Sequence, residues 1–519
     1  MKNSYSKGSW LMIMLLYGTV VFADSLTTES QSSIESALAI KKEKRLLYNE
    51  AESNDFYIDQ CARDVNGVCD PTIYYDRYIS VNNYIQNPYN NMITGGTRHM
   101  VTESDVQNKN IVEQFLTNGT YNAQIGAGWA LLNPYNNNYT YGGTLFAQSG
   151  HVEGFALGGA MEVVNPFLKP GYTYAVGDTK YGLFPVTQVV TPSQLYLEYQ
   201  LPDHVQVDAG WIFIQTPWMN SYDDAMMVTA PFQGVLANYQ LSTNWRLTGI
   251  ATNGYEEMGS VNFNQDTMYN ASYGNFITRS PSGGQNIFSD NYTSPGSIAL
   301  GSVYHPSEDY ELNMWAYSFS GFANTIYADS NYDIHVNPLN KFNIGVQAGN
   351  QNTLGMQTTA PQQVGDGSVN SNLVGAKLGY SFDDWFNIDA SYDTMFGPKN
   401  SFYGGGFISP YTFTIVNDPL YTSGLAAGLI EQGAGNAYRI GTIFKPIPGN
   451  SRSKIEFAYE QFDTVSPVKE YDVDLKYVPM MGPRGLIVHL EGDYATAPNT
   501  NYVNGGDFLF IEGIVTYTY

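Results

Sequence analysis

The sequence predicts an all-β protein, a transmembrane antiparallel β-barrel with short periplasmic turns and long extracellular loops. Three features predict it: an alternating C-terminal strand, an export signal, and a series of amphipathic hairpins. In the last segment, Leu509, Ile511, Gly513, Val515 and Tyr517 fall on one side, and Phe510, Glu512, Ile514 and Thr516 on the other. A strand of about ten residues with this period crosses a bilayer when it is tilted.

The N-terminus is typical of an exported protein. Lys2 and Lys7 precede an apolar run from Trp10 to Phe22, and Ala23 supplies a small residue at the cleavage position. We therefore interpret residues 1–23 as a signal peptide, because the run is too short and wrongly flanked for a membrane-spanning helix. An exported chain of this kind can be periplasmic, extracellular or an outer-membrane barrel, and the alternating C-terminal strand favours the barrel.

Residues 24–96 form a predicted N-terminal periplasmic extension. Apolar residues between Ile34 and Leu47 have helical spacing and are accompanied by clustered Lys and Arg, which predicts a short amphipathic helix. This helix could plug the pore or bind a partner, or the segment could be a partly ordered tail. Cys61 and Cys69 are the only cysteines. In an exported protein this close pair predicts a local disulfide that stabilises by about 2–3 kcal/mol, and a redox or metal site is disfavoured.

Amphipathic strands joined by tight turns follow. The turn at residues 202–204 separates Leu195–Leu201 from Val205–Trp211, and Phe382–Asp384 forms another turn. Other connections are long and polar, such as 259–297, 350–370 and 397–423. The barrel is therefore assigned to residues 97–519. Allowing ~23 residues for each strand together with half of its two connections, this segment accommodates about 18 strands, and about 16 strands are also compatible. A barrel of this size leaves an aqueous channel.

Composition excludes several classes of function. Charged residues make up only 14% of the chain, Tyr occurs 42 times, and the net charge is −24. Tyr suits a membrane interface, where its ring is buried and its hydroxyl is wet, whereas a strongly acidic chain is a poor partner for nucleic acid. Ser and His form no recognisable nucleophile or zinc motif. We therefore predict no enzymatic activity, no cofactor and no metal.

One segment resembles a known family. Between Gly210 and Gly234 the chain reads as a strand with Gly, then Thr216-Pro217, Asn220-Ser221 and Asp223-Asp224, then Pro231-Phe232 leading into the next strand. This order of residues resembles the corresponding segment of the OprD family of outer-membrane porins. A weaker resemblance, in the succession of strands and turns, extends over about residues 115–519.

The resemblance implies an 18-stranded barrel that passes small solutes passively through a constricted, charged channel. The chain departs from the family where an Arg is usual after the Asp, since Met226 and Met227 stand there, and it has only 24 Lys and Arg in total. The substrate preference of the family is therefore not transferred to this chain.

The faces opposite the apolar ones are expected to line the channel. Acidic residues outnumber basic ones among these positions, which would concentrate cations and repel anions. The predicted lining residues are Asp208, Arg246, Glu311, Lys377, Asp389, Arg439, Glu456, Asp474, Lys476 and Glu491. Asp223 and Asp224, between Pro217 and Pro231, are the predicted constriction, although the same pair could simply cap a turn in a surface loop.

These features together predict a porin of the bacterial outer membrane. It would allow passive diffusion of small polar solutes or ions, with a bias toward cations, through a channel narrowed by an inward loop. Expected partners are outer-membrane lipid and lipopolysaccharide, and the barrel-assembly machinery through the strand ending at Tyr519, in a monomer or trimer. The alternative is a surface structural or adhesin barrel with a plugged lumen.

Overall fold

The computed structural model describes most of the chain from residue 120 onward. The described residues are 75–76, 98–99, 115, 120–133, 136–167, 188–201, 205–221, 229–242, 244–256, 263–265, 294–307, 309–337, 339–353, 368–383, 385–407, 409–412, 418–425, 427–447, 453–464, 467–478, 486–496 and 507–518. The predicted signal peptide, the amphipathic helix, Cys61, Cys69, Asp223, Asp224 and Tyr519 all lie outside these residues.

The described residues are almost entirely strand. The strands are β1 Tyr75–Asp76, β2 Arg98–His99, β3 Thr120–Asn133, β4 Asn136–Gln148, β5 Phe155–Pro166, β6 Val189–Leu201, β7 Val205–Ile212, β8 Gln215–Thr216, β9 Met219–Asn220, β10 Phe232–Ser242, β11 Trp245–Glu256, β12 Phe263–Asn264, β13 Ser297–Ser307, β14 Tyr310–Phe319, β15 Ala323–Asn337, β16 Asn340–Asn352, β17 Asn370–Phe382, β18 Phe386–Phe396, β19 Gly435–Phe444, β20 Lys454–Asp463, β21 Val468–Tyr477, β22 Leu486–Thr496 and β23 Phe508–Thr518. Two single turns of helix, η3 Phe402–Gly405 and α6 Leu429–Gln432, interrupt the β18–β19 connection.

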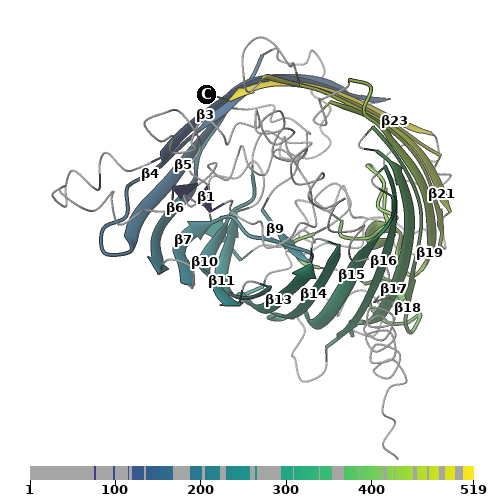
Figure 1. The fold of residues 1–519 in the computed structure, drawn as a ribbon, viewed down its shortest axis with the longest axis horizontal. Coiled ribbons are helices and arrows are strands. Elements are labelled where there is room, and N and C mark those ends of the chain that lie inside the picture. Colours follow the sequence, from purple (N-terminus) through teal and green to yellow (C-terminus); the bar gives the residue numbers. More distant parts are fainter. Residues whose placement is uncertain are drawn as a thin grey trace, which may run out of the picture.

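The long strands close into one antiparallel barrel (Figure 1). Each of its 18 strands pairs with its neighbours in the sequence, and the short strand β12 lies beside β11. The barrel closes where β23 pairs with β3, with Ile514 opposite Gly128. Closure leaves no unpaired sheet edge, which a bilayer could not solvate. The predicted fold class is confirmed, and of the two strand numbers considered, 18 is correct.

Alternation along each strand sets the two faces of the wall. On β6, Leu195 and Leu197 are exposed while Tyr196 and Glu198 are buried. The terminal strand follows the predicted pattern, since Val515 is exposed and Ile514 is buried. Because successive side chains point to opposite faces of a strand, the exposed apolar residues share the outer face.

Aromatic residues form two bands on this outer face. Near the short turns, Trp245 lies 5.2 Å from Tyr304, and Trp385 lies 5.3 Å from Phe444, measured between ring centroids. Farther along the strands, Tyr471 lies 6.3 Å from Tyr494. Exposed aliphatic side chains lie between the bands, among them Leu378, Ile440, Val473 and Leu490. An apolar belt between two aromatic girdles is the surface that lipid and its interfaces solvate. Among the described residues no helix is long and apolar enough to cross a membrane.

Connection lengths separate the two ends of the barrel, as predicted, with some exceptions. One end carries the short connections at 202–204, 243–244, 308–309, 338–339 and 383–385, and the other carries the long ones at 167–188, 213–231, 257–296, 353–369 and 397–434. Three connections at the long-loop end are nevertheless short, between β3 and β4, β14 and β15, and β20 and β21, which the alternating pattern of connections does not predict.

Two of the long connections contribute to a hydrophobic core inside the barrel. The β8–β9 hairpin contributes Trp218, which has no exposed surface, and the β18–β19 connection contributes Phe407 and Tyr411. Met219 forms a parallel bridge with Tyr411, and Figure 1 shows β9 within the ring of strands. An ordinary barrel of this size holds water, so these segments give part of the interior a packed core.

Candidate channel interior

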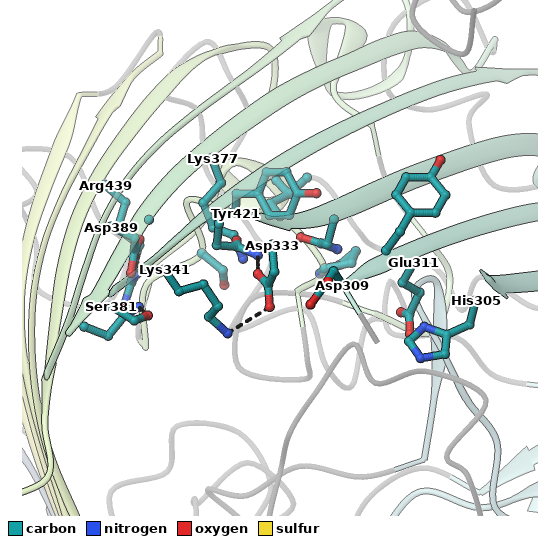
Figure 2. A pocket seen from close by; sticks show the side chains of 18 of the residues that line it. His305, Asp309, Glu311, Asp333, Lys341, Lys377, Ser381, Asp389, Tyr421 and Arg439 are labelled. Carbon is teal, nitrogen blue, oxygen red and sulfur yellow. Dashed lines mark hydrogen bonds and ion pairs between the residues drawn. The ribbon is translucent and has the colours of Figure 1, made fainter. Parts of the chain in front are cut away.

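A cavity of about 620 Å³ lies between the inner wall and the β18–β19 connection. Strands β13 to β19 supply the wall of this cavity, and residues 418–423 supply the opposite side (Figure 2). Most of the lining side chains are polar or ionisable; the ionisable ones are Asp309, Glu311, Asp333, Lys341, Lys377, Asp389, Asp418 and Arg439, with His305 and two tyrosines. The cavity lies toward the end that carries the short turns.

Neighbouring wall strands place opposite charges side by side. Lys341 on β16 donates from Nζ to Asp333 on β15 at 2.8 Å (Figure 2). The two positions are brought together by the tight β15–β16 hairpin, in which Asp333 is registered against Asn343. Lys377 on β17 lies with its ammonium 5.0 Å from the centre of the Tyr421 ring, in cation–π geometry.

Arg439 on β19 is the centre of the largest ionic network. Its Nη1 donates to Asp389 at 3.1 Å, its Nη2 to Glu456 at 2.6 Å, and its Nε to Glu460 at 2.9 Å. Three carboxylates thus share one guanidinium, whose planar set of donors suits such multiple contacts. The network carries a formal excess of negative charge on this wall.

The network continues along β20–β22. Lys454 donates to Glu456 at 3.0 Å and to Asp474 at 2.8 Å. Asp474 also lies 2.6 Å from His489 Nε2, and Glu491 lies 3.9 Å from the same nitrogen. These side chains share the inner face because they alternate with exposed outer residues such as Val473 and Leu490.

Asp418 lies on the inward connection rather than on the wall. It is half-buried, and one of its oxygens accepts a hydrogen bond from the backbone N–H of Leu420 at 2.9 Å. Burial, and to a smaller extent the nearby Asp393 carboxylate, raises the pKa of the Asp418 carboxyl to about 8 although the hydrogen bond from Leu420 lowers it. The side chain can therefore change charge close to neutral pH.

The β8–β9 hairpin is fixed by packing and by hydrogen bonds. Trp218 contacts the ring of Tyr327 on β15, with centroids 5.9 Å apart, and the ring of Phe407, at 4.7 Å. After residues 222–228, the backbone N–H and the hydroxyl of Thr229 both donate to the buried Glu162 on β5, at 3.1 and 2.6 Å. The connection between β7 and β10 is therefore anchored on both sides of residues 222–228.

Only some of the predicted lining residues lie around this cavity. Glu311, Lys377, Asp389 and Arg439 line the cavity. Glu456 joins them through Arg439, Asp474 joins Glu456 through Lys454, and Glu491 joins Asp474 through His489. The remaining three, Asp208 on β7, Arg246 on β11 and Lys476 on β21, lie on their strands but do not line this cavity.

Sequence reasoning missed several residues of this interior. Asp333 and Lys341 continue the inward alternation of β15 and β16, so the period-two pattern could have found them. Asp418, Trp218 and Phe407 lie in connections, where no periodicity marks a position as inward. Trp315 on β14 is also buried, and it stacks on Tyr317 with ring centroids 5.6 Å apart.

No protein-family model matches this chain, and no curated protein matches it in sequence. Solved structures of barrels do match. Acinetobacter baumannii OccAB3 is 14% identical with a TM-score of 0.64, and the similarity covers 78% of this chain and 100% of that one. The fold is that of an OprD-like barrel.

Two proteins of Pseudomonas aeruginosa agree with this result. OccK8 (OprE) and OpdK, the latter solved with vanillate, are each 13% identical with a TM-score of 0.61, and each similarity covers 78% of this chain and 99% of the other. At these identities the similarity shows the fold alone. The OprD-like fold predicted from the motif between Gly210 and Gly234 is therefore confirmed.

Proposed function

We propose that this OprD-like barrel is a porin of the bacterial outer membrane that allows passive diffusion of small polar solutes or ions. The observation that carries the proposal is the contrast between the two faces of one wall. The outer face is an apolar belt between aromatic girdles, and the inner face encloses a charged cavity of about 620 Å³. A wall of this kind holds a polar path within a bilayer.

The proposed channel favours cations. Carboxylates outnumber basic groups around the cavity, and Arg439 is surrounded by three acids. A low-dielectric wall concentrates the field of such an excess, which raises the local concentration of cations and lowers that of anions. Lys341 and Lys377 provide positive charge on the same wall, so solutes that carry both signs of charge are also accommodated.

The proposed channel is narrowed by inward segments. The β8–β9 hairpin and the β18–β19 connection pack together against β15 through Trp218, Phe407 and Tyr327. These aromatic contacts fill part of the interior, and the charged residues of β13–β19 that line the cavity lie nearer the short turns, along the proposed polar path. Asp223 and Asp224 follow this hairpin in the sequence and remain our candidates for the constriction.

The solute itself is not carried over from the similar structures. OpdK was solved with vanillate, an aromatic carboxylate. In this chain the guanidinium of Arg439 is already bound by three carboxylates, so a carboxylate solute would have to compete with them. Outer-membrane lipid and lipopolysaccharide, the barrel-assembly machinery and a monomeric or trimeric state are proposed from the fold in the same way. We propose no enzymatic activity.

Single-channel recording in a planar bilayer tests the proposal. Stepwise conductance with a cation-selective reversal potential under a KCl gradient is expected from the full-length protein purified from membranes. Asp333→Asn together with Asp389→Asn is expected to reduce cation selectivity, because both carboxylates line the cavity. The exposed Asp463, at the end of β20, gives the control variant Asp463→Asn, which should leave selectivity unchanged.

Two further outcomes are informative. Reduced conductance or selectivity in the Asp223→Asn, Asp224→Asn double variant would support the constriction, and wild-type behaviour would remove it while keeping the porin. A folded, heat-modifiable barrel that gives no conductance would contradict the porin and favour the surface or adhesin barrel with a plugged lumen.

A further inference from the structure

Three buried carboxylates gather on the inner face of β21 and β22, beyond the cavity described above. They are Glu470, Asp472 and Asp493, with exposed fractions of 0%, 5% and 0%. One oxygen of each lies within 4.8 Å of one oxygen of each of the others. The register explains the arrangement, since Asp472 is directly opposite Asp493, and Glu470 is two residues before Asp472 on the same face.

Asp493 is the residue that suggests a bound cation. It is fully buried, and neither of its carboxylate oxygens has a hydrogen-bond partner. Burial of a carboxylate without donors costs several kcal/mol. Glu198, another fully buried acid of the inner wall, does have partners: it accepts from Gln148 at 3.1 Å and lies 2.7 Å from His151.

The nearest guanidinium does not supply this charge. Arg439 acts on Asp472 electrostatically, but its nitrogens donate to Asp389, Glu456 and Glu460. Additional negative charge surrounds Asp493, from Glu491 beside it on β22 and from Glu512 on β23. Turning a donor of Arg439 toward this cluster would leave one of those three acids without its donor, whereas a separate cation would neutralise the cluster and keep the Arg439 network intact.

We propose that a divalent cation of the calcium type binds among Glu470, Asp472 and Asp493. Calcium is bound by six to eight oxygen ligands at about 2.3–2.6 Å. Two oxygens that both lie about 2.4 Å from one ion can be at most about 4.8 Å apart, which is the limit within which these three oxygens lie. Carboxylate oxygens are the ligands that such hard cations prefer.

The ion would also hold the inward connection against the wall. The backbone N–H of Leu425 donates to Asp472 Oδ2 at 3.3 Å. Gly424 lies so close that a Cβ there would be 2.7 Å from Glu470 Oε2. Because residues 418–423 of the same connection form one side of the cavity, neutralising the carboxylates beneath Gly424 and Leu425 stabilises that side.

Calcium binding to the full-length protein, refolded in detergent without lipopolysaccharide, tests the proposal. After treatment with EDTA and dialysis, titration calorimetry with CaCl₂ is expected to show one ion per chain. EDTA should lower the unfolding temperature of the wild type, and CaCl₂ should restore it. Asp493→Asn should weaken calcium binding at least tenfold and make the unfolding temperature insensitive to EDTA.

Glu198→Gln is the matched control, because Glu198 is another fully buried carboxylate of the inner wall. It should keep stoichiometric calcium binding. If Asp493→Asn does not fold, Glu470→Gln replaces it with the same expected loss of binding. Absence of calcium binding by the wild type, or binding unchanged in the folded variant, would overturn the site. Neither result depends on conductance, so failure here is distinguishable from failure of the proposed pore.

Discussion

Asp418 shows how a single position on a connection can set the charge of the interior. Its pKa is raised to about 8 by burial and by Asp393, whereas an exposed Asp ionises near 4. Between about pH 4 and 8 the folded protein therefore holds a proton on Asp418 that the unfolded chain has already released. The stability associated with this proton is present at low pH and is lost as the pH rises through about 8.

The expected consequence for transport is a pH-dependent selectivity. Between pH 7 and 9 Asp418 gains a negative charge in the cavity, so the cation preference measured by reversal potential should increase. Asp418→Asn should remove the increase over this interval while leaving selectivity at pH 6 close to that of the wild type. An equal increase in the variant would show that another group is responsible.

Arg439 gives a second prediction at the residue scale. Arg439→Gln leaves Asp389, Glu456 and Glu460 without their shared donor, and loss of one partner from a buried ionic network costs about 3–5 kcal/mol. The free energy of unfolding, measured by urea titration in lipid vesicles, should fall by about this amount. Lys341→Gln is the control. Its pair with Asp333 is partly exposed, and such pairs contribute about 0–1 kcal/mol. Equal losses in the two variants would contradict the difference in burial.

At the scale of elements, the β7–β10 connection depends on close backbone approach at both of its ends. Gly210 and Gly234 are directly opposite each other in the β7–β10 ladder. A Cβ at Gly210 would lie 2.2 Å from the carbonyl oxygen of Leu195, and Gly210 has a φ of 139°, which disfavours any other residue. Glycine is therefore required here for β7 to pair closely with β6 and β10.

The inward position of that hairpin is tested through Trp218. Trp218→Ala removes the ring that fills the space between Tyr327 and Phe407, at an expected cost of about 3–5 kcal/mol in unfolding free energy. The loosened hairpin should also raise single-channel conductance or its noise. Trp245→Ala, on the outer face near the short turns, should leave conductance unchanged. Unchanged conductance in Trp218→Ala would show that the β8–β9 hairpin does not narrow the channel.

At the scale of the whole molecule, the apolar belt predicts how the barrel sits in a bilayer. Ile440 is 55% exposed in the middle of β19, between the two aromatic girdles, and Phe396 is exposed at the long-loop end of β18. Arg at the bilayer midplane costs about 2–4 kcal/mol, and near an interface about 0–1 kcal/mol. Ile440→Arg should therefore lower the unfolding free energy in vesicles by much more than Phe396→Arg. Equal effects would be inconsistent with the proposed depth of these residues.

The sequence by itself determined the barrel. Period-two alternation, visible from Leu195 to Trp211 and from Leu509 to Tyr517, assigns each side chain to one face, and tight polar turns pair each strand with the next. These local rules are sufficient to place Glu311, Lys377, Asp389 and Arg439 on the inner wall, because inward positions on neighbouring strands must share one interior. They cannot fix which charges meet, since that depends on the stagger between strands.

The tertiary structure alone decided what occupies the interior. Trp218, Phe407 and Asp418 lie in connections without periodicity, and their inward position follows from packing against residues distant in the chain, such as Tyr327. The meeting of Asp472 with Asp493 likewise depends on the register of β21 and β22, which a shift of two residues would change without altering either face. Wall and faces are thus encoded locally, whereas the channel's charge and width depend on non-local packing.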